Sequence, residues 1–262
     1  MDKQLSIIYF SATDTTAKVV KEVANSLTDQ FKEYNITFPD QRQESLCFGG
    51  NDLVIVGVPV YSGRVPKFLL DYFTKVKGDK TLAVFIVVYG NRDYDDALLE
   101  LKDTLEEKGF IGVAAGAFIG EHSYTVKVAT GRPDAGDLQI AQTFAAKIKE
   151  KLKALGDKVP EEKLTVKGKY PYKERPASPL MAPVTSAECL NCGICAEYCP
   201  MRAISFDDFQ DADPGKCIRC CSCVKRCPVQ AKTMQHEAVA KITQMLLNNY
   251  TSRRCEPEFF LG

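Results

Sequence analysis

The sequence predicts an α/β domain built on a parallel sheet, followed by a small cysteine-rich domain. Three observations support this prediction. Apolar runs alternate with helical patterns over residues 1–155, the pattern breaks down over residues 156–184, and eight cysteines then fall into two copies of one motif. Strands that alternate with helices form right-handed crossovers, which place helices on both faces of a parallel sheet.

Five apolar runs are the expected strands. They are rich in Val, Ile and Ala and are continuous rather than alternating, as in strands that are buried on both faces. The expected strands cover residues 5–10, 36–38, 53–61, 82–90 and 113–119. The helices between and after them are expected at residues 15–31, 66–75, 94–108 and 137–155. The segment 39–51 is short for the helix that should follow the second strand.

The remainder of the chain divides into three parts. Five prolines break any long element over residues 156–184, so this segment is expected to be a linker. Residues 185–235 contain both cysteine motifs and form the expected cluster domain. Residues 236–262 carry a last helix, at about residues 237–250, followed by a tail. Apolar side chains recur along this helix at helical spacing, so the helix should dock on another part of the molecule.

The composition excludes some classes of protein. Lys plus Arg and Asp plus Glu both total 34, so the net charge is zero and a nucleic-acid-binding surface is not expected. The first residues do not form a signal peptide, and the longest apolar runs are too short to cross a membrane. We therefore expect a cytoplasmic protein in a reducing compartment, with no membrane span.

The two cysteine motifs carry the strongest chemical signal. They are Cys189-x2-Cys192-x2-Cys195-x3-Cys199-Pro200 and Cys217-x2-Cys220-x2-Cys223-x3-Cys227-Pro228. Three thiolates at this spacing can surround one iron–sulfur cubane, and the fourth cysteine, followed by proline, leads away toward another. Paired C-x2-C knuckles also bind zinc, but four ligands per zinc ion explain neither the third cysteine nor the repeated Cys-Pro.

The motifs resemble those of bacterial two-cluster ferredoxins. This resemblance implies two 4Fe–4S clusters with crossed ligand sets. One set is Cys189, Cys192, Cys195 and Cys227, and the other is Cys217, Cys220, Cys223 and Cys199. Cys221 stands outside both sets; we expect it to be a packing residue, with a substitute ligand or a tuner of the second cluster as the alternatives.

Three loops of the first domain point to a second cofactor. Hydroxyl side chains fill the loop of residues 11–16 between the first strand and its helix, which suits a phosphate group, although simple N-capping is the alternative. Residues 59–66 (PVYSGRVP) and 89–95 (YGNRDYD) follow the third and fourth strands. All three loops lie at the carboxyl ends of parallel strands, where such sheets bind ligands. The sequence contains neither G-x-G-x-x-G nor a Walker motif, which disfavours dinucleotides and ATP.

Together these loops resemble those of the flavodoxin family, over about residues 4–155. The loops are most similar to those of flavodoxin-like domains that are fused to bacterial-type ferredoxins in anaerobes. The resemblance implies bound FMN and a flavodoxin-like, doubly wound, five-stranded parallel sheet with strand order 2-1-3-4-5. Flavodoxins usually have glycine where this chain has Asp14, although aspartate tolerates the left-handed conformation better than most residues.

The resemblance also implies which residues hold FMN. The phosphate would be held by Ser11, Thr13, Asp14, Thr15 and Thr16. The ring would be enclosed by Pro59, Val60, Tyr61, Ser62, Gly63, Tyr89, Gly90, Asn91, Arg92 and Tyr94. Within this set the two tyrosines Tyr61 and Tyr94 are candidates to stack on the ring. Asn91 would bond its pyrimidine end, and Arg92 is either a cation near the N1–O2 edge or a solvated loop residue.

The predicted function is electron transfer between the clusters and FMN, which couples one-electron and two-electron redox partners in anaerobic metabolism. The expected partners are a donor and an acceptor protein. One alternative is an FMN-dependent reductase of a small-molecule acceptor, with a pocket formed by residues 120–133 and His122 as a candidate site residue. Another alternative is a redox-sensing module whose flavin loops are vestigial.

Overall fold

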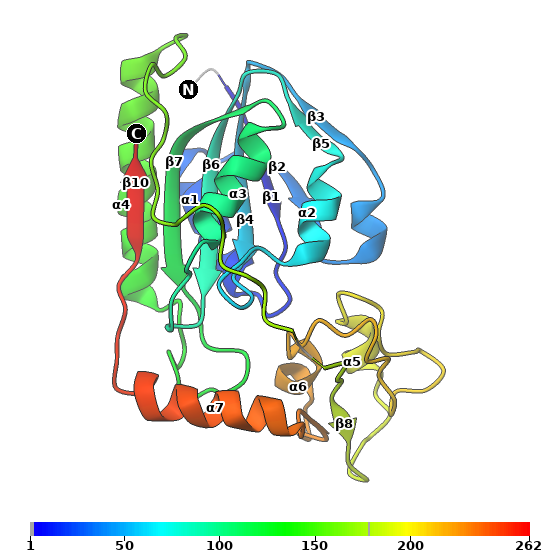
Figure 1. Cartoon of the computed structure of the whole chain (residues 1–262). Coiled ribbons are helices and arrows are strands. Elements are labelled where there is room, and N and C mark those ends of the chain that lie inside the picture. Colours follow the sequence, from blue (N-terminus) through cyan, green and yellow to red (C-terminus); the bar gives the residue numbers. More distant parts are fainter. Residues whose placement is uncertain (1–2, 178) are drawn as a thin grey trace.

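The computed structural model describes residues 3–177 and 179–262 (Figure 1). Its main body is a six-stranded sheet between two layers of helices. In spatial order the strands are β10 (Glu258–Leu261), β7 (Phe110–Ile119), β6 (Thr81–Tyr89), β4 (Asp52–Pro59), β1 (Gln4–Tyr9) and β2 (Lys32–Asn35). The last five of these are parallel to one another, and β10 pairs with β7 in the antiparallel direction.

This topology confirms the predicted fold class. The five parallel strands have the order 2-1-3-4-5 when they are numbered along the chain. The addition is β10, which the sequence did not reveal. It lies along the exposed edge of β7, with Phe259 opposite Gly116, so the C-terminal tail covers a sheet edge that would otherwise be open.

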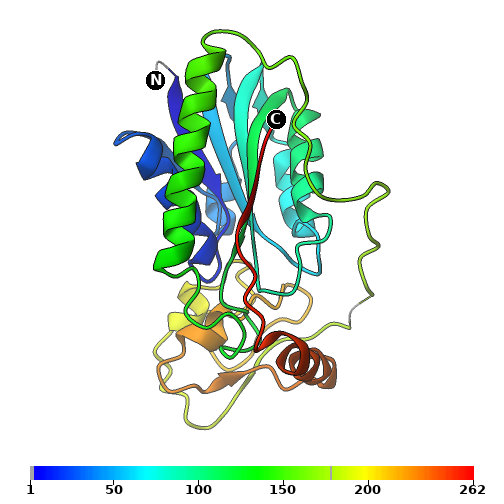
Figure 2. The ribbon, with the colours of Figure 1, turned by 90° about the vertical axis from the view of Figure 1, so that its left-hand side faces the viewer.

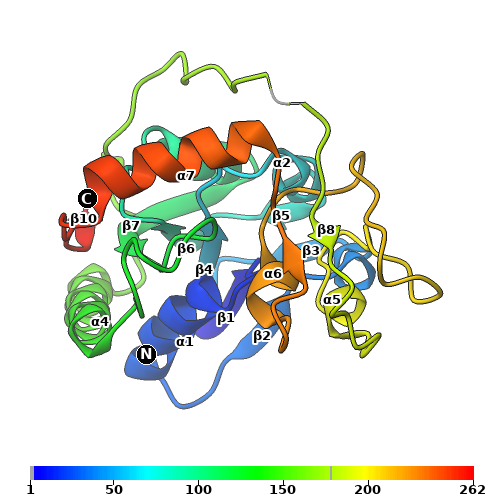
Figure 3. The same cartoon turned by 90° about the horizontal axis from the view of Figure 1, so that it is seen from below.

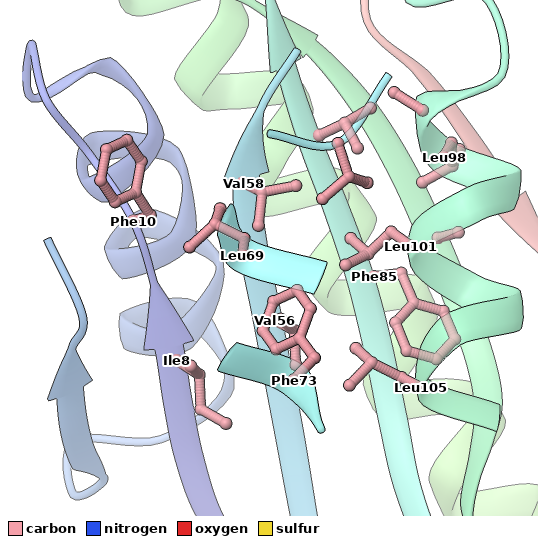
Figure 4. Close-up of a cluster of buried hydrophobic side chains, with 14 of the residues drawn as sticks. Ile8, Phe10, Val56, Val58, Leu69, Phe73, Phe85, Leu98, Leu101 and Leu105 are labelled. Atoms are coloured by element: carbon pink, nitrogen blue, oxygen red, sulfur yellow. The ribbon is translucent and has the colours of Figure 1, made fainter. Parts of the chain in front are cut away.

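The helices bury both faces of the sheet, as continuous apolar strands require. Figure 2 shows α1 (Thr15–Leu27) and α4 (Ala135–Leu155) on one face, and α2 (Lys67–Phe73) and α3 (Ala97–Glu106) on the other. Alternate residues of one strand enter the two cores, so Ile7 faces α1 and α4 whereas Ile8 faces α2 and α3. Figure 4 shows the second core, where Phe73 from α2 and Leu101 from α3 meet Val56 of β4.

The crossover after the first helix differs from the expectation. Strand β2 covers residues 32–35 rather than 36–38, because its partly exposed edge position accepts the polar sequence KEYN. No α-helix follows within residues 36–51; the chain instead forms a 3-10 turn, η1 (Pro39–Arg42), and the short strand β3 (Leu46–Phe48). Strand β3 pairs in parallel with β5 (Val76–Gly78) to form a separate two-stranded sheet.

The linker runs along α3 and is anchored there by polar contacts. The backbone N–H groups of Lys169 and Lys173 both donate to the Asp96 carboxylate, at 2.8 and 2.7 Å. The hydroxyl of Tyr172 donates to Asp103 at 2.8 Å. Leu164 is buried against the same face of the sheet. Residues 164–173 of the linker are therefore held against the sheet domain.

The cysteine-rich segment lies below the carboxyl ends of the parallel strands (Figure 1). Its elements are α5 (Ile194–Glu197), α6 (Ser222–Arg226), and the antiparallel pair β8 (Val184–Thr185) and β9 (Lys232–Thr233). Helix α7 (Glu237–Tyr250) then crosses beneath the sheet and leads the chain back to β10 (Figure 3). The last helix of the chain thus has the bounds that the sequence predicted.

Candidate cofactor sites

The eight motif cysteines line two cavities. Each cavity takes three cysteines from one motif and the fourth from the other. The first-motif cavity, with about 330 Å³ of empty space, is lined by Cys189, Cys192, Cys195 and Cys227. The second-motif cavity, with about 390 Å³, is lined by Cys217, Cys220, Cys223 and Cys199, and also by Cys221, which stands outside both motifs. This grouping favours the crossed ligand sets over two sets that are each local to one motif.

The internal repeat extends to the backbone conformation. Asn191 and Gly193 in the first motif have left-handed φ angles of 51° and 78°, and the equivalent residues Arg219 and Cys221 have φ angles of 58° and 59°. Cys221 therefore occupies the position of Gly193, at the N-cap of the short helix in its repeat. Its thiol lies 3.7 Å from the carbonyl oxygen of Arg219. The structure gives this cysteine a backbone role, at a cost of about 1 kcal/mol for a left-handed non-glycine residue.

Two of the thiols accept equivalent backbone hydrogen bonds. The N–H of Ala203 donates to the sulfur of Cys199 at 3.2 Å, and the N–H of Ala231 donates to the sulfur of Cys227 at 3.1 Å. Both donors lie four residues beyond the cysteine. Hydrogen bonds to cluster-ligating sulfurs stabilise the thiolate and adjust the reduction potential of an iron–sulfur cluster.

The positions of the thiols do not by themselves distinguish a cluster from zinc. A tetrahedral zinc site would gather four sulfurs at about 2.3 Å from one point. In the part of the chain that the structure describes, no group of three or more His, Cys, Asp or Glu side chains lies close enough together to hold a metal ion of any kind. The motif thiols line two separate cavities, and all eleven cysteines are free. The preference for a cluster over zinc therefore rests on the cysteine spacing, with its third cysteine and repeated Cys-Pro.

The loop of residues 11–16 forms the N-terminal end of α1. Asp14 is the N-cap residue, with a left-handed φ of 65°, and its side chain caps no N–H group of the first turn. The Ser11 hydroxyl instead accepts from the N–H of Ala17 at 3.0 Å, and the N–H of Ser11 donates to the Thr37 hydroxyl at 3.0 Å. This loop leads into the N-terminus of α1, and the backbone N–H groups of a helix N-terminus suit a phosphate dianion.

A cation reaches this loop from the cysteine-rich segment. The guanidinium of Arg226 lies 2.5 Å from the Asp14 carboxylate. The loop's neighbour Lys18 points elsewhere and donates to the carbonyl oxygen of Pro133 at 2.7 Å. Sequence reasoning missed Arg226 because it lies 212 residues from its partner, inside the second cysteine motif.

The loops after β4 and β6 are joined to each other. Ser62 and Gly63 form a tight turn with φ angles of 54° and 79°, closed by hydrogen bonds between Tyr61 and Arg64. The carbonyl oxygen of Gly63 accepts from the N–H of Asp96 at 3.1 Å. A Cβ atom at Gly63 would collide with the Asp95 side chain, so glycine is required by close approach as well as by φ.

The arginine of the GRVP sequence has a structural role. Arg64 forms a two-point contact with Glu100 of α3, at 2.8 Å from Nε and 2.5 Å from Nη2. The Glu100 carboxylate also accepts from the N–H of Val65, at 2.8 Å. The side chains of Arg64 and Glu100 are only 11% and 3% exposed. This buried pair fixes the loop of residues 59–65 on the sheet domain.

Four of the residues expected to enclose the flavin ring make contacts with other residues of the protein. Tyr94 is buried and its hydroxyl donates to Glu258 at 2.8 Å, while Tyr89 packs beside it with ring centroids 5.4 Å apart. The Asn91 side chain is buried in hydrogen bonds to the C-terminal tail, and Arg92 pairs with a nearby aspartate. Tyr94 and Asn91 are therefore hydrogen-bonded within the protein, and their contacts with a flavin ring remain predictions.

A fourth loop, after β7, contributes to the same edge. A Cβ atom at Gly90 would collide with the imidazole of His122, so the two loops are in close contact. The Nδ1 atom of His122 accepts from the N–H of Tyr124 at 3.1 Å. Burial, and then the positive charges of Lys225 and Arg92, lower the pKa of His122 to about 4, so this histidine is neutral at pH 7.

The cysteine-rich segment docks directly on these loops. Lys225 pairs with Glu121 at 2.6 Å, in addition to the contact of Arg226 with Asp14. Cys220 is buried in the same apolar cluster as the sheet domain's core, and both Tyr61 and Ile218 pack against that cluster. The second cysteine motif therefore covers the edge of the sheet on which the four loops lie.

Comparison with known proteins identifies both parts of the chain. Residues 6–126 match a family model described as a flavodoxin domain. Residues 188–231 match one described as a 4Fe-4S dicluster domain. The chain is a flavodoxin domain fused to a 4Fe–4S dicluster domain. Domains of these kinds carry electrons on FMN and on iron–sulfur clusters, so the fusion is a flavo-iron–sulfur protein of electron transport.

Several solved structures resemble the flavodoxin domain of the fusion. A flavodoxin from the domain Archaea shares 13% identity, with 57% of this chain and 99% of that chain covered and a TM-score of 0.40. Flavodoxin 1 from Bacillus cereus shares 15% identity over 56% of this chain and 98% of its own, with a TM-score of 0.42. Rubredoxin oxygen:oxidoreductase from Desulfovibrio gigas shares 18% identity over 58% of this chain and 37% of its own, with a TM-score of 0.42.

The search of curated proteins finds no match to the fusion. Within residues 3–177 and 179–262, no helix is both long enough and apolar enough to span a membrane.

Proposed function

We propose that this fusion transfers electrons between two 4Fe–4S clusters and one FMN, and thereby couples one-electron partners to two-electron partners. The observation that carries the proposal is the position of the second cysteine motif. It lines a thiol cavity on one side and contacts the flavin loops through Cys220, Lys225 and Arg226 on the other. A chain that only stored or sensed electrons would have no need to dock its cluster domain on those loops.

The proposed cluster ligands are the two crossed sets of cysteines. Cys189, Cys192, Cys195 and Cys227 would hold one cluster, and Cys199, Cys217, Cys220 and Cys223 would hold the other. Each 4Fe–4S cluster takes four thiolates, one per iron. The first-motif cavity is lined by four cysteines, and the second-motif cavity by its four motif cysteines and Cys221. The free thiols fit a reducing compartment. Low oxygen, as in anaerobic metabolism, protects exposed cysteine ligands such as Cys192 from oxidation.

The proposed FMN site has a phosphate end and a ring end. At the phosphate end, the N-terminus of α1 and the hydroxyls of residues 11–16 would hold the dianion, with Arg226 close by. At the ring end, Tyr61, Gly90, His122 and Tyr124 come from three loops that meet at the docked second motif. Bound FMN would supply two-electron redox chemistry that can proceed in single-electron steps.

In the proposed reaction, the electrons balance when two molecules of a one-electron donor protein react for each flavin. A bound flavin would supply a two-electron acceptor, which would be filled by one electron from each of two molecules of a one-electron redox protein together with protons from solvent. The chain's role is to hold the centres close and dry, because the redox chemistry belongs to the cofactors. A two-electron acceptor would complete the turnover and restore the oxidised protein.

The alternative reductase with a small-molecule pocket receives less support. The loop of residues 120–133 closes on itself through hydrogen bonds from Glu121 to Arg132 at 2.8 Å and from His122 to Val128 at 3.1 Å. Its Glu121 side chain is committed to Lys225 of the cluster domain. These contacts support electron transfer to the docked second motif rather than a substrate pocket formed by residues 120–133.

Anaerobic purification with cofactor analysis tests the proposal. We expect about eight iron atoms, about eight inorganic sulfides and about one FMN per chain. Stoichiometric zinc in place of iron would refute the cluster assignment. A preparation that contains iron but neither retains nor binds FMN would refute the coupling of one-electron to two-electron chemistry.

A further inference from the structure

We infer, on the basis of the proposed function, that the two cysteine cavities have different roles. Cys199, Cys217, Cys220 and Cys223, which line the second-motif cavity, would hold the cluster that exchanges electrons with the flavin. The first-motif cavity is the port at which a one-electron redox protein with a positively charged surface docks. The two motifs are near copies in sequence, so this division of roles comes only from their positions in the folded chain.

The lining of the second-motif cavity is built into the flavodoxin domain. Cys220 is buried in the core cluster of that domain. Pro200, which follows the crossed ligand Cys199, accepts a hydrogen bond through its carbonyl oxygen from Arg42 of η1 at 2.9 Å. Helix α6, which begins within the second motif, holds the flavin loops through Lys225 and Arg226. In Figure 3 this helix lies beneath the start of α1 and the end of β1.

Two tyrosines, Tyr61 and Tyr124, lie on the flavin loops. Tyr61 is packed against the core cluster that contains Cys220. The Tyr61 and Tyr124 side chains are both partly buried. The backbone N–H of Tyr124 donates to His122, which contacts the loop after β6.

The first-motif cavity faces away from the flavodoxin domain. The ammonium group of Lys232, which lines it, donates to Thr185 at 2.5 Å and to the carbonyl oxygen of Gln210 at 2.9 Å, both within the dicluster domain. Cys192 is exposed, and its neighbour Leu190 is 65% exposed. Val229, also in the lining, is 39% exposed. Apolar side chains beside a surface thiol suit the centre of a transient redox interface.

Charge defines the partner that fits this port. Phe209 lines the first-motif cavity, so the loop around it forms part of the rim. Asp207 and Asp208 on this loop, and Glu188 beside Cys189, are all exposed. A rim of negative charge around an apolar centre attracts a redox protein whose own cofactor edge is positively charged. Such steering raises association rates at low ionic strength without large buried area.

Electron counting with oxidised cytochrome c, a basic one-electron acceptor, tests the order of the centres. The protein is reduced with dithionite, desalted anaerobically and mixed with excess cytochrome c. We expect wild type to deliver about four electrons in the rapid phase, one from each cluster and two from the flavin, which releases its protons. Each electron converts one ferric haem to ferrous haem.

Two cysteine variants should separate the roles. Cys217→Ala should retain about four irons and deliver about one rapid electron, because the flavin side loses its route to the port. Cys192→Ala should also retain about four irons but lose the rapid phase. Cys47→Ala, at an exposed cysteine outside both motifs, is the matched control. Rapid delivery of the flavin electrons by Cys217→Ala, or an intact rapid phase in Cys192→Ala, would overturn the assignment.

The cysteine variants could fail because the dicluster domain unfolds. A variant that keeps all eight cysteines avoids this problem. Lys225→Ala with Arg226→Ala weakens the docking on the flavin loops and should leave the iron content unchanged. Its rapid phase should fall from about four electrons to about two, since only the clusters remain connected to the port. The charge-matched control is Lys147→Ala with Lys149→Ala, at exposed positions of α4. An unchanged four-electron phase in the docking variant contradicts the proposal.

The port itself is tested by salt dependence. Asp207→Asn with Asp208→Asn should lower the second-order rate constant for cytochrome c by about tenfold at low ionic strength and have no effect at high ionic strength. Asp71→Asn with Glu107→Gln removes the same charge from exposed sites on the flavodoxin domain and should leave the rate unchanged. Equal effects of the two pairs would place the docking surface elsewhere. A wild type with full iron but only about two electrons would instead refute the FMN proposal.

Discussion

The buried contact between Arg64 and Glu100 should control the stability of the flavin-loop scaffold. Glu100 receives the N–H of Val65 and both Arg64 and Arg175, and its side chain is 3% exposed. The hydrogen bond to Glu100 is the main cause that raises the pKa of Arg64. Glu100→Gln preserves the shape of the side chain but leaves the Arg64 guanidinium buried without a counter-charge.

The expected loss follows from that uncompensated charge. Removal of one member of a buried ion pair lowers the free energy of unfolding by about 3–5 kcal/mol. In a protein of this size, 1 kcal/mol corresponds to about 2–4 °C in Tm. Glu100→Gln should therefore lower the Tm by about 6–20 °C.

Anaerobic scanning calorimetry of the holoprotein at a fixed scan rate gives the measurement. Lys241→Ala is the control, because it breaks an ion pair with Glu237 whose side chains are 74% and 78% exposed. Such an exposed pair contributes less than about 0.5 kcal/mol, or about 2 °C. If Glu100→Gln and Lys241→Ala shift the Tm equally, the reasoning about the buried pair is refuted.

Three further predictions concern single side chains at the flavin edge. Asn91→Ala should speed hydrogen exchange in residues 251–262, because Asn91 holds Tyr250, Arg253 and Cys255; weaker FMN binding with unchanged exchange would instead place Asn91 in the ring site. Asp14→Gly should tighten FMN binding about fivefold, since a carboxylate worth about 1 kcal/mol of repulsion leaves the phosphate site while the left-handed backbone is kept; weaker binding in an FMN titration would contradict this. The pKa of His122 is about 4 in the folded protein and about 6.5 in the unfolded chain. Protonation of His122 therefore favours unfolding. The stability from neutral His122 is complete above about pH 6.5 and is lost toward pH 4, so His122→Gln should gain about 2 kcal/mol relative to wild type between pH 7 and pH 5. Parallel Tm–pH curves would show that His122 does not titrate in this way.

The sequence predicted the elements whose signal is local. Continuous apolar runs identified β1, β4, β6 and β7, because strands buried on both faces need no alternation. The position predicted for strand β2 was wrong by a few residues, because an edge strand tolerates a polar sequence. Strand β10 was not predicted, because its four residues form a strand only by pairing with β7, which is far away along the chain.

The same limit applies to the cofactor sites. The cysteine spacing is local, so the motif residues were identified without the fold. Asn91, in contrast, reads locally as a flavin-loop residue, yet its partners lie 159 to 164 residues further along the chain. Arg226 and Lys225 read as ordinary charged residues until the fold places them against Asp14 and Glu121. Contacts of this kind depend on docking between domains, which no local pattern encodes.

Stopped-flow mixing of the oxidised holoprotein with a one-electron donor, followed at several protein concentrations, tests the central claim most directly. After the clusters bleach, the flavin should be reduced in a phase whose rate does not depend on protein concentration, because the electrons move within one chain. A flavin that stays oxidised, or a flavin phase whose rate rises in proportion to protein concentration, would contradict the account.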